Sequence, residues 1–297
     1  MSWRTVVITK TSKLDYSMGH LVVRDVESTV KVHISEISVL VIESTAVSVT
    51  AALLCELIKK KVKVIFCDEK HNPLSELTPY YGSHDCSLKI KRQIAWNETV
   101  KQCVWTQIVA EKIKNQAKVL EIYKLPQSSM LMGYIDELEL NDKSNRESHA
   151  AKVYFNALFG KSFSRNDECP VNAALNYGYS IVLSVFNREI TANGYLTQLG
   201  LFHDNMFNQY NLSCDLMEPF RPFVDIAVKD MNPQKFEKEE KISILNLLND
   251  EFKIDDRTQT FINAVKIYCK SVFDAIEECD TSLIRFAGKL LKIGVRL

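Results

Sequence analysis

Several motifs that define large protein classes are missing from this sequence. It contains no G-x-x-x-x-G-K-[ST] and no G-x-G-x-x-G, so nothing indicates the use of a nucleotide triphosphate. The absence of H-E-x-x-H disfavours a zinc protease. No apolar stretch is long enough to cross a bilayer, and no apolar run follows a charged start, so neither a membrane span nor a secretory signal is indicated. We expect a cytoplasmic protein without membrane contact.

Paired cysteines and an excess of one charge are missing as well. The eight cysteines include no C-x-x-C and stand singly among apolar residues, which indicates reduced core thiols and disfavours a zinc finger. The 37 basic and 37 acidic residues give a formal net charge of zero. Proteins that bind nucleic acid are often basic overall, so this balance argues mildly against DNA. A local basic patch, or one built by an oligomer, stays open.

The length and the hydrophobic pattern predict two domains. The 297 residues, of which 46% are hydrophobic, suffice for two cores. Short β-branched runs in residues 1–80 predict a small β-sandwich with one helix at 49–60. Its predicted strands are 5–9, 21–24, 30–34, 39–42 and 62–67. A linker is predicted at 81–86, where Gly, Ser and Asp cluster.

The pattern of residues 87–297 predicts a larger helical domain. Helical periodicity is clearest over 97–123, 142–160, 172–192, 238–248 and 261–278, and 251–256 is predicted as a short strand or turn. The predicted fold class is α+β, with an N-terminal β-sandwich followed by an all-α catalytic domain. The 97–123 helix has a polar face that we interpret as solvated, with a phosphate-tracking stripe as the alternative. That face carries Lys101, Lys112, Lys114 and Lys118.

The segment 203–225 contains side chains that are typical of a site where a cation binds a phosphate. Asp215 and Glu218 are three residues apart, so a helix would place both carboxylates on one face. A divalent metal would relieve their repulsion, because hard cations take oxygen ligands. His203, just before this helix, offers an imidazole ligand or a proton carrier. The alternative is structural: acids in a first turn favour the positive helix end, and a lone histidine is more often a hydrogen-bonded structural residue.

Two prolines bear on the shape of this segment. Pro219 and Pro222 each remove a helical N–H, which predicts a short or kinked helix beside Glu218. Arg221 stands between them and can either hold a phosphate bidentately or orient a carboxylate, of which we favour the second.

A third acid stands on the predicted 142–160 helix. Glu147 is followed at helical spacing by Ala150, Ala151 and Tyr154, so two small side chains leave room to approach its carboxylate. Ser144-x-x-Glu147 is also a capping box, in which the glutamate only satisfies a backbone N–H. The pattern leaves both interpretations open.

The 172–192 helix offers auxiliary groups. Asn172, Asn176 and Tyr179 fall near one face, where amides and phenols can hold a phosphate or a metal ligand in place. Ordinary buried hydrogen bonds are the alternative for each of them.

These motifs resemble a known family. E-x-x-A-A-x-x-Y-F from Glu147, G-L-F-H ending at His203 and C-D-L-M-E-P-F-R-P-F-V-D around Glu218 are similar to the CRISPR-associated endonuclease/integrase family Cas1. Further motifs resemble the form found beside type II effectors. They are W-R-T-V-V-I-T-K-T-S-K-L at 3–14, L-T-P-Y-Y-G-S-H-D at 77–85, R-Q-I-A-W at 92–96 and N-Y-G-Y-S at 176–180. The resemblance runs from residue 3 to about residue 228.

The resemblance implies a site and its cofactor. The family's metal-binding triad of Glu, His and an acid maps onto Glu147, His203 and Glu218, with Asp215 as an auxiliary group. Many members carry Asp at the last position, and Glu there looks like the type II variant. The implied cofactor is Mg²⁺ or Mn²⁺.

The resemblance also implies an activity and partners. The activity is a metal-dependent DNA endonuclease and integrase that inserts short foreign DNA segments into a CRISPR array for antiviral defence, by attack of a 3′-hydroxyl on a phosphodiester. The implied partners are double-stranded DNA, a second copy bound through the N-terminal domain, the small protein Cas2, and other type II adaptation or effector proteins. Two alternatives stay open: a non-catalytic DNA-binding scaffold whose carboxylates cap helices, and a metal-dependent phosphodiesterase not specific to DNA.

Overall fold

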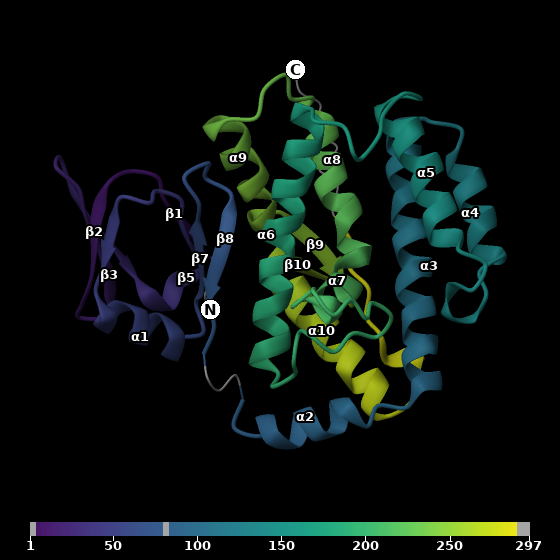
Figure 1. The fold of residues 1–297 in the computed structure, drawn as a ribbon, viewed down its shortest axis with the longest axis horizontal. Helices are drawn as coiled ribbons and strands as arrows, with labels where there is room; N and C mark the ends of the chain where they lie inside the picture. Colours follow the sequence, from purple (N-terminus) through teal and green to yellow (C-terminus); the bar gives the residue numbers. More distant parts are fainter. Residues whose placement is uncertain (1–3, 80–82, 290–297) are drawn as a thin grey trace. The chain divides into compact units, whose positions relative to one another are not determined.

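The computed structural model describes residues 4–79 and 83–289 (Figure 1). The chain divides into two compact units, Met1–His84 and Asp85–Leu297. The boundary falls within the predicted linker 81–86, of which residues 81 and 82 lie outside the described residues. Trp3, in the first motif above, and residue 80 also lie outside them. None of the described helices is long and apolar enough to span a bilayer.

The first unit is built from two four-stranded sheets. One has the strand order β1-β5-β7-β8, in which β1, β5 and β7 are parallel and β8 is antiparallel. The other has the order β4-β3-β2-β6, in which only the β2–β6 pair is parallel. The elements are β1 Arg4–Ile8, β2 Ser12–Ser17, β3 His20–Arg24, β4 Thr29–His33, the 3₁₀ turn η1 Ile34–Glu36, β5 Ile37–Ile42, β6 Val47–Val49, α1 Ala51–Lys59, β7 Lys63–Cys67 and β8 Pro73–Leu77.

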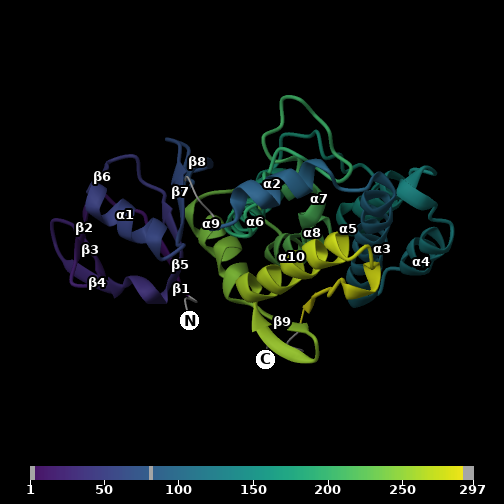
Figure 2. The ribbon, with the colours of Figure 1, turned by 90° about the horizontal axis from the view of Figure 1, so that it is seen from below.

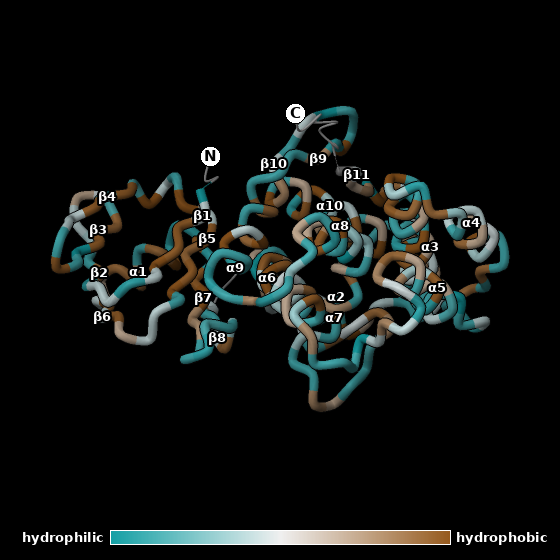
Figure 3. The backbone as a smooth tube through the Cα atoms, turned by 90° about the horizontal axis from the view of Figure 1, so that it is seen from above, coloured by the Kyte–Doolittle hydropathy of each residue, from teal (hydrophilic) through white to brown (hydrophobic). Residues whose placement is uncertain are grey.

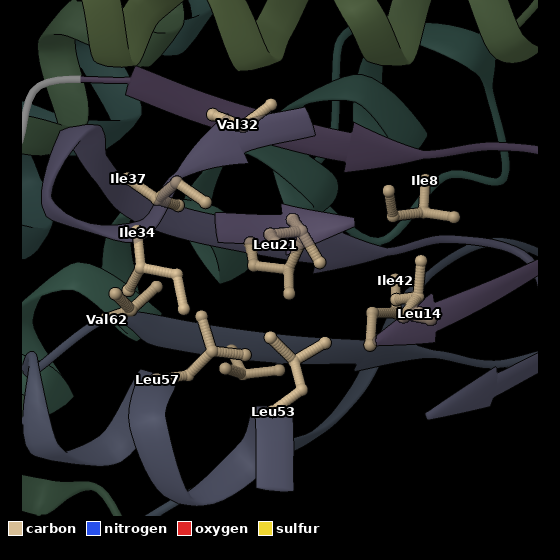
Figure 4. Packing of buried hydrophobic residues seen from close by; sticks show 12 residues of the cluster. Ile8, Leu14, Leu21, Val32, Ile34, Ile37, Ile42, Leu53, Leu57 and Val62 are labelled. Atoms are coloured by element: carbon tan, nitrogen blue, oxygen red, sulfur yellow. The ribbon is translucent and has the colours of Figure 1, made fainter. Parts of the chain in front are cut away.

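One hydrophobic core joins both sheets and α1. Leu14 and Leu21 from the second sheet meet Ile8 and Ile42 from the first, and α1 adds Leu53 (Figure 4). The strand β5 reads I-S-V-L-V-I and is buried at every position, because both its faces are covered. Figure 3 shows the resulting hydrophobic band along β1 and β5.

The prediction of a β-rich first unit is confirmed, but three of its strands were not predicted. β2 has only two apolar residues among polar ones, and β6 is only 3 residues long. β8 begins with Pro73, which a sheet tolerates because β8 is an edge strand. Each of these strands is fixed by its pairing rather than by its own composition.

The second unit is predominantly helical, as predicted. Its helices and turns are α2 Cys86–Ile94, α3 Glu98–Ile122, α4 Ser128–Asp136, η2 Leu140–Asp142, α5 Arg146–Phe159, α6 Pro170–Ala192, α7 Asn211–Met217, η3 Glu218–Phe220, α8 Arg221–Met231, α9 Lys238–Leu245, η4 Asn246–Asn249, α10 Phe261–Glu277 and η5 Thr281–Leu283. It is not all-α: β9 Glu251–Ile254 pairs with β10 Arg257–Thr260 and with β11 Gly288–Lys289. The pairing of 257–260 and 288–289 with it was not visible from the local pattern.

Two long helices organise the second unit. α3 packs against α4, α5 and α8, while α6 packs against α7, α8, α9 and α10 (Figure 1). Gly178 on α6 permits this packing, since a Cβ there would clash with Val224 on α8. The chain from α7 to α8 is broken by the short turn η3, which begins at Glu218 and contains Pro219. The prediction of a short or kinked helix is confirmed, since α7 is only 7 residues long.

Candidate active site

Glu147 lies in the first turn of α5, but its carboxylate does not cap the helix. Asp142 caps it instead: its carboxylate accepts hydrogen bonds from the backbone N–H of Arg146 at 2.7 Å and of Glu147 at 3.1 Å. The Ser144 hydroxyl donates to the Glu137 carbonyl at 3.3 Å rather than joining a capping box. The capping-box interpretation was therefore wrong, and the Glu147 carboxylate turns to another partner.

That partner is Lys112 on α3. Its ammonium pairs with Glu147 Oε1 and lies 2.5 Å from Glu218 Oε2. Lys112 is only 7% exposed, so the prediction of a solvated lysine face is wrong at this position, although Lys114 and Lys118 are exposed as predicted. Three separate elements, α3, α5 and η3, thus bring two carboxylates together around one buried positive charge.

Arg221 supplies a second positive charge to Glu218. Its Nε lies 3.1 Å from Glu218 Oε1, so the guanidinium orients a carboxylate in this structure. Burial alone raises the pKa of the Glu218 carboxyl, but Arg221 and Lys112 outweigh it and hold that pKa below its usual value. Burial opposes the charge of Lys112, yet Glu218 and Glu147 raise its pKa above the usual value. The charged forms of Glu218 and of its two cations therefore stabilise one another.

The Asp215 carboxylate accepts hydrogen bonds from the turn that precedes α7. Its Oδ2 accepts hydrogen bonds from the backbone N–H of Leu201 at 2.6 Å and of Phe202 at 3.0 Å. Gly200 lets the chain wrap this closely, since a Cβ there would lie 2.8 Å from Asp215 Oδ2. The three-residue spacing suggested a metal between Asp215 and Glu218; the structure instead directs Asp215 to the 201–203 turn.

The same carboxylate fixes His203. Asp215 Oδ1 accepts from the His203 backbone N–H at 3.2 Å and lies 2.5 Å from its ring Nδ1. The ring Nδ1 donates in this pair, which leaves Nε2 for another group. The hydrogen bond to Asp215 raises the pKa of His203 above its usual value despite partial burial, and nearby Glu218 adds to the effect. The rings of Trp105 and Phe202 meet the imidazole edge-on at 5.8 and 5.6 Å.

The predicted auxiliary residues of α6 form a neighbouring layer. The side-chain oxygens of Asn172 and Asn176 accept hydrogen bonds from the Arg165 guanidinium, which lies 5.5 Å from the centre of the Tyr179 ring. Arg221 lies 4.9 Å from the same ring centre. The two asparagines therefore hold Arg165, while Tyr179 lies beside the arginine that orients Glu218.

Asp225 ties this layer to α8 and α5. It accepts hydrogen bonds from the hydroxyls of Tyr179 at 2.5 Å and of Tyr154 at 3.0 Å. Burial raises the pKa of Asp225 to about 6, even though both tyrosines lower it.

The raised pKa of Asp225 predicts a pH-dependent stability. The folded protein binds this proton more tightly than the unfolded chain, whose Asp pKa is about 3.9, so the contribution is present below about pH 4 and is lost as pH rises through about 6. The loss amounts to about 3 kcal/mol.

Asp225→Asn is expected to remove this pH dependence of the free energy of unfolding, measured by urea denaturation between pH 4.5 and 7.5. Asp230→Asn is the control, because exposed Asp230 also accepts a tyrosine hydroxyl, from Tyr123. If the free energy of unfolding of Asp225→Asn varies with pH as steeply as that of the wild type, Asp225 is not the source of the pH dependence.

Lys112 is the residue that sequence reasoning missed. A signal was present: Val104, Ile108 and Lys112 recur every four residues, so the lysine falls on the apolar stripe rather than on the polar face. A lysine inside an apolar stripe needs a buried acid, and Glu147 and Glu218 were both candidates.

The comparisons with known proteins agree on one family. The model of the family described as CRISPR associated protein Cas1 matches residues 5–253. A CRISPR-associated endonuclease Cas1 from Neisseria meningitidis serogroup C is 36% identical over 229 residues, which cover 77% of this chain and 75% of the relative. One from Francisella tularensis subsp. novicida is 26% identical over 71% of this chain and 73% of its own.

Solved structures share the fold. A casposase bound to an integration product matches with a TM-score of 0.77 and 16% identity, over 95% of this chain and 93% of its own. A Cas1 protein from Thermotoga maritima matches with a TM-score of 0.74 and 15% identity, over 92% and 97%. The chain belongs to the Cas1 family of CRISPR-associated proteins, as its motifs indicated.

Proposed function

We propose that this protein is a metal-dependent DNA integrase that inserts short foreign DNA segments into a CRISPR array. The observation that carries the proposal is the meeting of Glu147 and Glu218 around one buried cation, with His203 held nearby by Asp215. Family membership supports the nuclease chemistry, and the fold shared with a casposase on an integration product supports strand joining.

The donor set suits Mg²⁺ or Mn²⁺. Carboxylate oxygens are the ligands that these cations prefer, and an imidazole whose other nitrogen donates to a carboxylate is a usual partner. Glu218 Oε2 is buried, and its partner in this structure is the Lys112 ammonium at 2.5 Å. Within 4–79 and 83–289 no three acidic, histidine or cysteine side chains already converge as a metal site, because the Lys112 ammonium stands between the two glutamates. Glu147, Glu218 and His203 would hold the metal once that ammonium moves aside.

A bound metal would polarise a phosphodiester oxygen and offset the negative charge that builds on the phosphate. The protein's own residues supply the rest. With Nδ1 anchored on Asp215, His203 presents Nε2 in a fixed direction, as the nitrogen that would face the metal. Arg221 keeps the Glu218 carboxylate oriented. A DNA 3′-hydroxyl and water are both suitable nucleophiles for such a site, which accounts for joining and cleavage alike.

The proposed partners follow from the relatives. Two structural neighbours are Cas6-RT-Cas1–Cas2 complexes, and one of them aligns over 97% of this chain with a TM-score of 0.74. We propose that this chain works with Cas2, as a homodimer, on double-stranded DNA at the leader–repeat junction, in the cytoplasm and in the type II form. The scaffold alternative is weakened, since it required Glu147 to be a helix cap. The general phosphodiesterase alternative is left to experiment.

Strand joining tests the proposal. The protein is mixed with Cas2, a short duplex with free 3′-hydroxyls and a supercoiled plasmid carrying the repeat, with Mn²⁺ or with EDTA. Joined product is expected with Mn²⁺ only. Protein that binds the duplex but yields no joined product with any divalent metal would support the scaffold, and hydrolysis of small phosphodiesters without DNA joining would support the general phosphodiesterase.

A further inference from the structure

Two large apolar side chains stand in solvent close to His203. Met206 is 87% exposed and Phe207 is 85% exposed, in the loop between α6 and α7. Figure 2 shows this green loop projecting beyond the helices around it, and Figure 3 shows a hydrophobic tip on an otherwise hydrophilic loop. Single exposed apolar residues are ordinary on protein surfaces, but two adjacent ones beside a reacting group suggest a contact surface.

The loop is held in shape by asparagines. Asn205 Oδ1 accepts from the Phe207 backbone N–H at 2.9 Å, and Asn208 Oδ1 accepts from that of Tyr210 at 2.9 Å. The Asn211 amide donates to the carbonyl of Asn205 at 3.1 Å and to that of Gln198 at 3.1 Å. The backbone around the two apolar side chains is thus fixed while the side chains stay in water, so a partner would meet a preorganised tip.

The surface around His203 combines apolar and polar side chains. Phe202 is 46% exposed even though its ring stacks on Trp105 at 4.6 Å. Next to it lies a cavity of about 470 Å³, whose lining is mostly polar and includes His203 and Lys101 together with the apolar Leu199. Its volume lies in the range of sites that enclose small organic groups, about 300–1,000 Å³.

We propose that Met206 and Phe207 insert between stacked bases of target DNA beside the phosphodiester that is attacked. This rests on the proposed integrase function. Phe and Met are among the side chains that proteins use as wedges between base steps, where they unstack and kink the duplex. Four residues span at most about 14 Å, so Phe207 reaches within about four base pairs of a phosphate held at His203.

The chemistry of the loop favours DNA over other occupants. Apart from Asp204, residues 203–210 carry no acid, and their remaining polar groups are amides and one phenol, which approach DNA without charge repulsion. The cavity beside His203 has both polar groups and the apolar Leu199 in its lining, so it offers an unstacked base hydrogen-bonding partners as well as an apolar contact. Unstacking a base step near the reacting phosphate would also kink the duplex beside it.

Base stacking and joining are measured together on one target. A duplex that spans the leader–repeat junction carries 2-aminopurine within four base pairs of the joined phosphodiester, and the protein is used in full length with Cas2 and Mn²⁺. The wild type is expected to raise the 2-aminopurine fluorescence. Phe207→Ala is expected to abolish most of that rise and to slow joining about 10-fold, in line with the loss of one aromatic–base contact. Val26→Ala, which removes a fully exposed apolar side chain of the first unit, is the matched control.

A mismatched target separates insertion from a structural effect. A mismatch at the same base step already lowers the cost of unstacking, so it is expected to restore joining by Phe207→Ala to within about 2-fold of wild type. Equal loss on paired and mismatched targets, or unchanged fluorescence and joining in Phe207→Ala, would overturn the inference. So would a Phe207→Ala protein that no longer co-elutes with Cas2, since the loop would then bind protein.

The same experiment keeps the two proposals apart. Wild-type protein that unstacks the duplex in a Phe207-dependent way but joins nothing would retain the loop's role and reject the integrase. If the wild type and Phe207→Ala join DNA at equal rates, the proposed integrase function stands and the wedge is rejected.

Discussion

His203→Ala is expected to lower strand joining by about 10²-fold or more while the protein stays folded and still binds DNA, because removing even a group that orients a metal ligand costs about 10–100-fold. The ring is held by Asp215 through Nδ1, so the substitution removes a group that presents Nε2 in one direction. The imidazole is partly exposed, and the residue lies in a turn between helices, so truncation leaves the core intact. The measurement is the initial rate of joined product with Mn²⁺ and Cas2, beside the Tm and the Kd for the duplex.

The matched control is His149→Ala. His149 is exposed and lies on α5 only two residues after Glu147, so it tests whether any histidine close to the carboxylates affects the rate. Wild-type joining by His149→Ala and loss by His203→Ala is the expected pair of results. Undiminished joining by a folded His203→Ala protein would remove His203 from the mechanism and leave the two glutamates as the remaining candidates.

Lys112→Met is expected to destabilise the metal-free protein by about 3–5 kcal/mol, because it leaves Glu218 buried with only Arg221 as a cation and Glu147 facing it. The side chain is unbranched and of similar length, so packing changes little. The measurement is urea denaturation in EDTA. Mn²⁺ is then expected to stabilise Lys112→Met more than wild type, since no ammonium has to leave the space between the carboxylates, and to bind it more tightly in calorimetric titration.

Lys118→Met provides the control on the same helix. Lys118 is exposed and lies 3.9 Å from Glu111, which also pairs with Lys114 at 3.4 Å, so losing this long contact to an exposed lysine is expected to cost about 1 kcal/mol or less. A Lys112→Met protein as stable as wild type in EDTA would mean that the glutamates separate once the lysine is gone. Weaker Mn²⁺ binding by Lys112→Met would mean that the ammonium supports the metal rather than competing with it.

Local sequence predicted the helices of the second unit well where caps and breakers are local. The helix predicted at 97–123 starts after Asn97, whose side chain accepts a hydrogen bond from the Val100 N–H at 3.3 Å. Pro219 breaks the chain at Glu218, as a missing N–H requires. These features involve neighbours within four residues, so a pattern in the chain is enough to find them.

The weaker predictions concern contacts between distant segments. The strands β6 and β11 have too few residues to show a pattern, and pairing alone defines them. Ser144 and Glu147 have the spacing of a capping box, but Asp142 accepts the hydrogen bond from the Glu147 N–H that Ser144 would have capped. Two nearby side chains could have capped α5, and the path of the chain into the helix placed Asp142 rather than Ser144 there.

The sequence by itself determined the two-unit organisation, the helical second unit and, through its motifs, the Cas1 family with Glu147, His203 and Glu218 as its candidate residues. Only the tertiary structure decided what surrounds them. Lys112 became the cation between the two glutamates, because α3, α5 and η3 meet there. A buried charge must find its partner in space, and the order of residues along a helix does not say which other segment will provide it.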